Sequence, residues 1–204
     1  MGIYDKYVLP RVLDLGLRNK DAARLRALRI PEARGDVFEV GIGSGLNLPF
    51  YSDEVRRVYG ADPSVELGRM ARKRASAQRV PVEFLVQSAE SAIPLADASV
   101  DSVVSTWTLC SIPDARAALR EMRRVLKPGG SFIFVEHGRS PEVKVARWQD
   151  RLNPIWKPIC GGCNINRQMD QLIESGGFRI TELQNEYLPG PRAMMYVYHG
   201  IARG

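Results

Sequence analysis

An acid followed by three glycines is the part of the sequence with the clearest chemical meaning. Glu39 lies in an apolar run, and one residue separates each glycine of the series Gly41, Gly43 and Gly45. A short β-branched apolar run predicts a buried strand, and the glycines after it let the backbone turn tightly and approach a ligand closely. The NAD-type fingerprint has its third glycine three residues after the second, so the spacing here points away from a pyrophosphate.

A second acid stands at the end of the next predicted strand. Asp62 comes 17 residues after Gly45 and is followed by Pro63. Nucleotide-binding sheets place a carboxylate at about this distance, where it accepts hydrogen bonds from both ribose hydroxyls. The glycine series and the spaced acid together predict a ligand that contains a nucleoside.

The elements that must hold these residues alternate between strand and helix. Apolar runs predict strands over residues 37–41, 55–62, 82–86, 101–107 and 131–136, and amphipathic runs predict helices over 65–78 and 113–126. Such alternation requires right-handed crossovers and a mostly parallel sheet. A helix over 168–175 and two strands over 178–187 and 193–202 follow, and the short turn at 188–191 predicts that these two strands pair antiparallel. We therefore expect one α/β domain over residues 1–204 with a seven-stranded, mostly parallel sheet and an antiparallel C-terminal strand.

Two segments lie outside this alternation. Residues 1–34 predict a helical cap, with one helix over about 10–17 and a second that begins at Asn19 or Asp21. Residues 139–167 break the alternation with prolines, Trp148 and Trp156, so no regular element is predicted there, and we expect this insertion to cover the acceptor side of the site. The cap is basic and amphipathic, so it could lie on an anionic membrane surface or pack its apolar stripe on the domain.

Composition narrows the class of protein. The chain has 204 residues and a net charge of +6, which fits one globular domain. Basic residues gather in residues 1–34 and again in residues 69–79. Neither cluster has the interleaved aromatic residues of a surface that stacks nucleic-acid bases, so we expect no nucleic-acid partner. No stretch is long and apolar enough for a signal peptide or a spanning helix, and three cysteines are too few for a disulfide scaffold. These features predict a cytoplasmic protein, with peripheral contact to the inner membrane surface left open.

Several motifs in order carry a resemblance to a known family. They are Glu39-Val-Gly41-x-Gly43-x-Gly45, Asp62-Pro63, Ala89-Glu90, Asp97-x-Ser99-Val100-Asp101 and Val125-Leu126-Lys127-Pro128-Gly129-Gly130. Their order and spacing resemble the class I methyltransferases that use S-adenosylmethionine (SAM), which implies a doubly wound, Rossmann-like fold. The further motifs Thr108-Leu109-Cys110-Ser111, Glu136-His137 and Gly162-Cys163-Asn164-x-x-Arg167 look like the methyltransferase-like thiol S-methyltransferases. Similar bacterial chains are grouped with phospholipid and quinone methyltransferases.

The resemblance implies SAM as the cofactor. The residues it assigns to SAM lie in the glycine loop and at the ends of the later strands: Glu39, Gly41, Gly43, Gly45, Asn47, Asp62, Pro63, Ser88, Ala89, Glu90 and Thr106. Glu39 is expected to face the ammonium group, and Leu46 and Asn47 to begin a helix whose N-terminus favours the carboxylate. Ser88 stands where many quinone-type relatives have an aspartate, and its hydroxyl can still hydrogen-bond beside the adenine.

The acceptor side carries fewer signals. Trp107, Thr108, Trp148 and Trp156 are the candidates for substrate binding, and His137, Tyr4 and Tyr187 are the candidates for taking a proton. A thiol with a pKa of about 8.5 needs little help to ionise, so His137 could equally serve as a hydrogen-bonding residue of its loop. The pair Cys160 and Cys163 lacks a second ligand pair at zinc spacing, so we expect no metal.

The sequence therefore predicts an enzyme that methylates a small molecule. Three functions are weighed, two of them catalytic and one non-catalytic. A thiol is the expected acceptor, the amine of a phosphatidylethanolamine head group is the second choice, and a non-catalytic SAM-binding protein on a membrane is the third. The oligomeric state stays open.

Overall fold

The chain forms one seven-stranded sheet whose strand order brings the N-terminal strand to the middle. The structure, a computed structural model, describes residues 4–204. The strands are β1 (Gly35–Val40), β2 (Val55–Ala61), β3 (Val82–Leu85), β4 (Val100–Thr106), β5 (Leu126–His137), β6 (Arg179–Tyr187) and β7 (Tyr196–Arg203), in the order β3-β2-β1-β4-β5-β7-β6. Only β7 runs antiparallel to its neighbours β5 and β6. This topology confirms the predicted α/β class and the antiparallel C-terminal strand.

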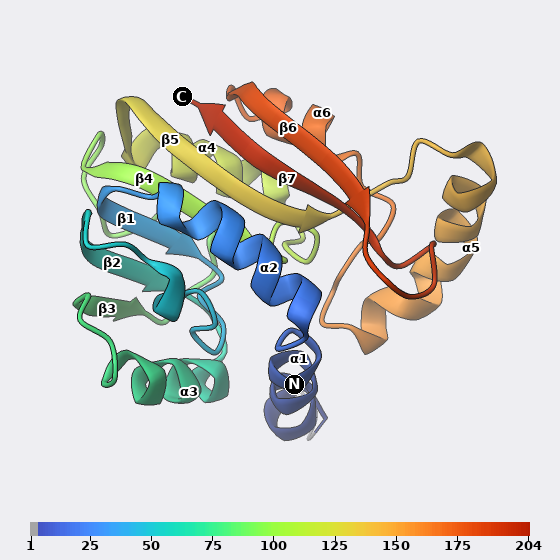
Figure 1. Cartoon of the computed structure of the whole chain (residues 1–204), viewed down its shortest axis with the longest axis horizontal. Helices are drawn as coiled ribbons and strands as arrows, with labels where there is room; N and C mark the ends of the chain where they lie inside the picture. The colour runs from blue at the N-terminus through green and yellow to red at the C-terminus, as the bar shows by residue number, and fades with distance from the viewer. Residues whose placement is uncertain (1–3) are drawn as a thin grey trace.

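Helices cover both faces of the sheet. Helix α2 (Lys20–Arg29) lies over β5 and β7, whereas α4 (Ala115–Val125) and α6 (Met169–Ser175) lie behind the opposite face (Figure 1). Helix α3 (Val65–Ala75) follows β2. Polar side chains start these helices: Asn19 accepts a hydrogen bond from the backbone N–H of Ala22, and Asp114 accepts one from that of Ala117. These N-caps satisfy backbone donors that a helix start would otherwise leave unpaired.

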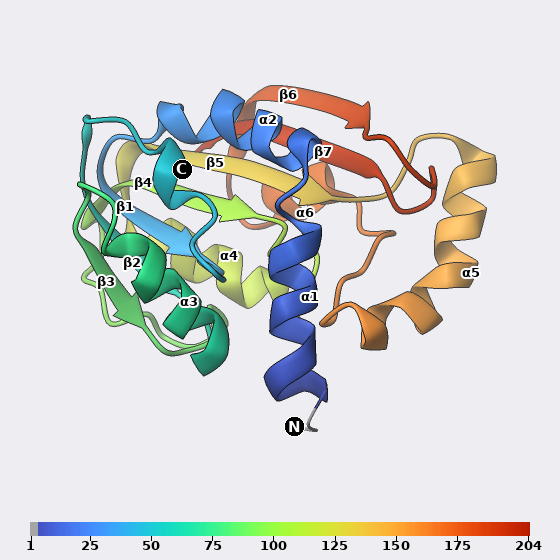
Figure 2. The same cartoon turned by 60° about the horizontal axis from the view of Figure 1, so that its bottom comes forward.

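The two segments outside the alternation meet at the carboxyl ends of the parallel strands. Helix α1 (Leu9–Gly16), which follows a π-helical turn at Tyr4–Val8, and helix α5 (Val143–Ile159) both lie beyond those ends in Figures 1 and 2. The Tyr4 hydroxyl donates to the carbonyl of Ile159 at 2.9 Å, which joins the start of the described chain to the end of α5. The buried Gln149 on α5 accepts from the N–H of Ser140 and donates to two carbonyls of the neighbouring loops. The insertion is therefore fixed to the domain.

Three local predictions are corrected. No α-helix begins at Leu46 or Asn47, because the chain makes only a short 3₁₀ turn at Leu48–Phe50 before it extends again. Residues 139–167 contain the 17-residue helix α5, with Pro154 and Pro158 inside it, where the prolines had favoured an irregular insertion. The strand predicted over 131–136 begins earlier, because β5 starts at Leu126 directly after α4 and includes Gly129 and Gly130.

Among the residues that the structure describes, no helix combines the length and the apolar character needed to cross a membrane.

Candidate active site

The glycine loop after β1 is built for close approach of a ligand. Gly41, Gly43 and Gly45 all have positive φ angles, of 66°, 55° and 80°. These are left-handed conformations that side-chain-bearing residues rarely adopt. A Cβ atom on Gly41 would come within 2.3 Å of the Thr108 side chain, whereas one on Gly43 would meet only the carbonyl oxygen of Gly41, at 3.7 Å. The backbone at Gly43 therefore faces open space that a cofactor can fill.

Asp62 lies at the carboxyl end of β2 and faces this loop. Its Oδ2 accepts a hydrogen bond from the N–H of Gly43 at 3.0 Å, and its Oδ1 accepts one from the N–H of Ser64 at 2.8 Å. Burial raises the pKa of the carboxyl group, and the two backbone hydrogen bonds act in the opposite direction. Pro63 lies between Asp62 and the Ser64 N-cap of α3. The sequence spacing of loop and acid thus corresponds to a direct contact.

Glu39 is a buried acid at the centre of a polar network. Its side chain accepts hydrogen bonds from Asn47 Nδ2 and from the Tyr51 hydroxyl, both at 2.8 Å. Burial raises its pKa to about 7, although both hydrogen bonds favour the ionised form. Asn47 Nδ2 also donates to Thr106 Oγ1 at 3.0 Å, and Arg26 Nε donates to Asn47 Oδ1 at 3.1 Å. The network joins the glycine loop, the end of β4 and helix α2.

These features fit SAM. Arg26 reaches the buried Glu39 carboxylate only through Asn47, and no described side chain forms an ion pair with it. It is therefore a partner for the cofactor's ammonium group, since pairing offsets the cost of burying the ionised form. Asp62 at the end of the second strand suits the ribose hydroxyls, and the open backbone at Gly43 leaves room for the ligand between them. Glu39, Gly43 and Asp62 would thus hold the amino acid and nucleoside ends of the cofactor.

The loop proposed for the adenine makes a different contact. The carboxylate of Glu90 accepts from the Ser88 hydroxyl at 3.1 Å and from the N–H of Asp114, at the start of α4, at 2.7 Å. Ala89 packs into the main core cluster. The acid therefore fixes the loop to α4, and the assignment of residues 88–90 to the adenine stays a prediction.

Glu136 organises the loop after β4, a role that sequence reasoning missed. This fully buried carboxylate accepts from the Ser105 hydroxyl at 2.7 Å and from the N–H groups of Thr108 and Leu109, each at 3.0 Å. It also accepts from the N–H of Cys110 at 3.3 Å. The sequence does contain a pattern that could have identified Glu136: an acid at the end of an apolar run that predicts a strand, which is the pattern that singled out Glu39.

Trp107 starts this loop in a strained conformation. Its φ angle is +50°, which is an outlier for a bulky residue. The Arg26 guanidinium lies 4.7 Å from the centre of its ring. Thr108 Oγ1 lies 3.4 Å from the carbonyl oxygen of Gly41, so the loop after β4 contacts the glycine loop. The structure thus brings the predicted residues Trp107 and Thr108 beside the predicted cofactor residues.

The three candidates for proton transfer lie in different surroundings. His137 Nδ1 lies 3.8 Å from Cys163 Sγ, at the carboxyl end of β5. The Tyr187 and Ser140 hydroxyls are 2.6 Å apart, and the Arg192 guanidinium covers the Tyr187 ring at 3.9 Å. Tyr4 contacts the end of α5, as described above. Of the three, only His137 is adjacent to the residues that organise the loop after β4.

The two tryptophans of the insertion are not equivalent. Trp148 is 56% exposed, and Arg151 lies over its ring. Trp156 packs against the main core, and its buried Nε1 has no hydrogen-bond partner among the described residues. Trp156 is therefore placed to line an interior surface, whereas Trp148 faces solvent.

A further contact that the sequence did not reveal joins the cap to the glycine loop. The buried Asp14 of α1 accepts from the Ser44 hydroxyl at 2.6 Å and pairs with Arg74 of α3 at 2.8 Å. Arg74 also donates to the carbonyl of Ser44. The N-terminal helix is therefore bonded to the loop that carries the three glycines.

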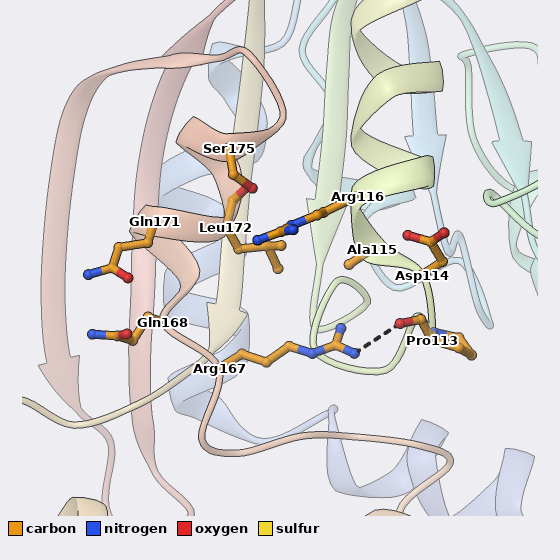
Figure 3. Close-up of a pocket in the computed structure, with 9 residues that line it drawn as sticks. All are labelled: Pro113, Asp114, Ala115, Arg116, Arg167, Gln168, Gln171, Leu172 and Ser175. Carbon is orange, nitrogen blue, oxygen red and sulfur yellow. Dashed lines mark hydrogen bonds between the residues drawn. The ribbon is translucent and has the colours of Figure 1, made fainter.

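A depression of about 360 Å³ lies between α4 and α6 (Figure 3). Its lining is mostly polar, and Arg167 donates across it to the carbonyl of Pro113. It shares no lining residue with the glycine loop or with the ends of β1 and β2. We therefore assign the cofactor to the glycine loop, where the buried acids converge.

The fold and this site define a class of protein. The strand order with the antiparallel β7, the glycine loop and the acids at the ends of β1 and β2 are those of a SAM-binding methyltransferase, and the chain belongs to the class I SAM-dependent methyltransferases. Residues 38–134 match the family described as "Methyltransferase domain".

Curated relatives make the comparison more specific. The chain is 38% identical to thiol S-methyltransferase TMT1B of Rattus norvegicus, over 76% of this chain and 64% of the relative. It is 35% identical to the Homo sapiens TMT1B, over 83% of this chain and 69% of the relative. It is also 32% identical to the phosphatidylethanolamine N-methyltransferase of Cereibacter sphaeroides, over 60% of each chain. The chain thus spans less than two thirds of the rat relative's length.

Solved structures support the fold. A chain from the complex between the Haloferax volcanii Trm112 methyltransferase activator and a methyltransferase matches with a TM-score of 0.71 at 19% identity. The match covers 96% of this chain and 97% of that chain.

Proposed function

We propose that the protein is a SAM-dependent thiol S-methyltransferase. The observation that carries the proposal is the extent of the similarity to human TMT1B, which covers 83% of this chain. The family match over residues 38–134 accounts for only part of that length. The likeness to a thiol methyltransferase therefore includes residues outside the part that the general methyltransferase family describes.

Bound SAM supplies a methyl group on a sulfonium, and the neutral thioether that departs, S-adenosylhomocysteine, needs no proton. The protein's own residues then have to hold the acceptor in line, exclude water and accept the acceptor's proton. Glu39 and Asp62 fix the cofactor from opposite ends, and the loop held by Glu136 presents Trp107 and Thr108 to the reacting side. His137 is the proposed group nearest to this loop that can take or share a proton.

A matched pair of acceptors tests the proposal. Purified protein and SAM are incubated with 2-mercaptoethanol or with ethylene glycol, which has oxygen in place of the sulfur, and S-adenosylhomocysteine is measured. We expect turnover with the thiol alone, a methyl thioether by mass spectrometry, and strong loss of turnover in Asp62→Ala. Turnover that is equal with both acceptors, or absent with every thiol tried, would overturn the proposal.

A second candidate is methylation of a phosphatidylethanolamine amine. It is supported by the similarity to the Cereibacter enzyme and by the surface of α1, where Val12 is 54% and Leu15 is 74% exposed beside the basic Arg11. Vesicles of phosphatidylethanolamine and, as the control, phosphatidylcholine test this candidate. Turnover with phosphatidylethanolamine but with neither phosphatidylcholine nor a thiol would replace the thiol proposal. SAM binding without turnover on any acceptor would favour the non-catalytic alternative.

A further inference from the structure

Two cysteines and a histidine from three separate segments meet beside the loop after β4. Cys163 Sγ lies 3.5 Å from Cys110 Sγ and 3.8 Å from His137 Nδ1. The three potential ligand atoms all lie within 4.8 Å of one another. Both cysteines are buried, whereas His137 is partly exposed. His137 is therefore the most exposed member of the cluster.

Two of these separations match the edges of a tetrahedral zinc site. With Zn–S bonds of about 2.3 Å and Zn–N bonds of about 2.05 Å, a tetrahedral ion places two sulfurs about 3.8 Å apart and a sulfur and a nitrogen about 3.6 Å apart. The two separations that involve Cys163, 3.5 and 3.8 Å, differ from these values by about 0.3 Å or less, and the third pair, Cys110 and His137, lies within 4.8 Å. Two thiolates and a neutral imidazole would also balance the charge of a divalent ion in this buried setting.

The backbone around the ligands is held in place before any ion binds. The N–H of Cys110 donates to the buried carboxylate of Glu136, next to His137. The carbonyl of Cys110 accepts from both the backbone N–H and the side-chain amide of Asn164, next to Cys163, each at 2.9 Å. Glu136 and Asn164, the neighbours of His137 and Cys163 in the chain, therefore hold the backbone of Cys110. Hydrogen bonds of this type around a metal site keep its ligands in position.

We propose that Cys110, His137 and Cys163 bind a zinc ion and that the thiolate of the acceptor takes its fourth coordination position. The second half of the proposal rests on the proposed thiol methyltransferase function. Three protein ligands with two sulfurs and one nitrogen leave a tetrahedral ion one position for a substrate or water. With its Nδ1 on the ion, His137 holds the metal in place of the proton-accepting role given above. A thiol that coordinates to the ion releases its proton to solvent and stays a thiolate at neutral pH, because a metal ion lowers the pKa of its ligand.

The cluster lies on the reacting side of the site. Cys110 is two residues from Thr108, whose side chain touches the carbonyl of Gly41 in the glycine loop. A thiolate held at this cluster would therefore sit on the same loop as the residues beside the cofactor. The sequence alone pointed to Cys160 and Cys163 and lacked a second pair. The structure provides the partners of Cys163 from Cys110 and His137, while Cys160 lies outside the cluster.

Cys160 offers a matched control, because it is a cysteine of the same segment that the proposal leaves without a role. Protein purified in tris(2-carboxyethyl)phosphine and dialysed against a chelator is titrated with zinc chloride, and bound metal is read by mass spectrometry under native conditions. We expect about one zinc ion per chain in the wild type and in Cys160→Ser. We expect loss of stoichiometric zinc in Cys110→Ala and in Cys163→Ala.

Cobalt(II) in place of zinc tests the ligand set and the fourth position. We expect sulfur-to-cobalt charge-transfer bands that weaken in either cysteine variant, and visible bands that shift when 2-mercaptoethanol is added but not when ethylene glycol is added. SAM binding, measured by calorimetry, shows that each variant is folded. Absence of stoichiometric zinc in the wild type, or equal zinc in the wild type and both alanine variants, would overturn the metal site.

The two proposals fail in different ways. Cobalt bands that do not respond to the thiol would overturn the acceptor position and leave the metal site standing. Zinc binding with no thiol methylation would overturn the proposed function alone, because the metal measurements need no turnover. A Cys110–Cys163 disulfide that persists in the reductant would overturn the metal site directly.

Discussion

Replacing Glu136 by alanine should destabilise the protein more than any surface substitution, because it leaves several buried donors without an acceptor. The side chain is fully buried and accepts three backbone N–H bonds, from Thr108, Leu109 and Cys110, and one hydroxyl bond, from Ser105. Each buried donor left unsatisfied costs about 1–3 kcal/mol.

The three backbone donors set the magnitude. Leaving all three unpaired would cost about 3–9 kcal/mol in total. Two effects reduce this cost: water can enter the cavity and pair with the donors, and the variant no longer has to bury a carboxylate. We therefore expect a loss of about 3–5 kcal/mol in the free energy of unfolding, which lowers the melting temperature by roughly 10 °C for a chain of this size. Glu136→Gln keeps one acceptor oxygen, so its loss should be less than half as large.

Urea unfolding followed by circular dichroism measures both variants, and Glu83→Ala is the control because Glu83 is exposed on β3. The control should stay within about 0.5 kcal/mol of the wild type. If Glu136→Ala is within about 1 kcal/mol of the control, the carboxylate does not hold the loop after β4 and the reasoning is refuted. If the glutamine variant is as unstable as the alanine variant, the negative charge matters more than the number of hydrogen bonds.

Three further outcomes follow from the buried titratable groups. Asp62→Ala should weaken SAM binding by about 3 kcal/mol, roughly 150-fold, because the ribose hydroxyls lose a charged acceptor. Calorimetry measures the SAM affinity of this variant and of the control Asp53→Ala, whose replaced side chain is exposed. Equal affinities of the two variants would contradict the prediction. SAM affinity should rise with pH up to about 7, the pKa of the Glu39 carboxyl group, and level off above it. The ligand-free protein should lose stability as the pH rises from about 4.5 to about 7, because folding raises this pKa and the unfolded chain releases the proton first. Glu39→Gln should remove this pH step, and a wild type with a flat profile would refute the pairing with the ammonium group. Burial and the Arg29 charge lower the pKa of His199. The stability of the protein should therefore fall as the pH drops below about 6.5, where the unfolded chain takes up the proton first. Urea unfolding should show a smaller fall in His199→Gln than in the wild type, and an equal fall in both proteins would rule this out.

Much of the fold could be predicted because its signals are local. The alternation of apolar and amphipathic runs depends on the period of each element, and the glycine series depends on backbone conformations that few residues adopt. The contact between the glycine loop and Asp62 also follows from spacing, since consecutive parallel strands end at the same edge of a sheet. These features needed no knowledge of distant contacts.

The unpredicted parts depend on contacts between distant segments. Cys110 and Cys163 are 53 positions apart and meet only because the loop after β4 and the segment after α5 pack together. Prolines at positions 154 and 158 pointed to an irregular insertion, yet α5 forms around them and is held by Gln149. The expected helix after the glycine loop fails at a Leu-Pro-Phe turn, where residues 48–50 form only a 3₁₀ segment. Local propensity is a weak guide where tertiary packing decides.

The position of β7 between β5 and β6 determines the order in which the sheet can be completed during synthesis. Strand β6 pairs with β7 alone, so after it leaves the ribosome it has no neighbour until β7 has also been made. Until then β5 pairs with β4 alone, and its other edge, in a strand that carries Phe132 and Phe134, is an open apolar strand edge of the kind that joins other chains. Closing this gap needs contacts between residues about 70 positions apart, such as Ser131 with Arg203. The half-made protein is therefore most prone to aggregate before β7 is inserted, and chaperones that bind extended apolar segments would act at this stage.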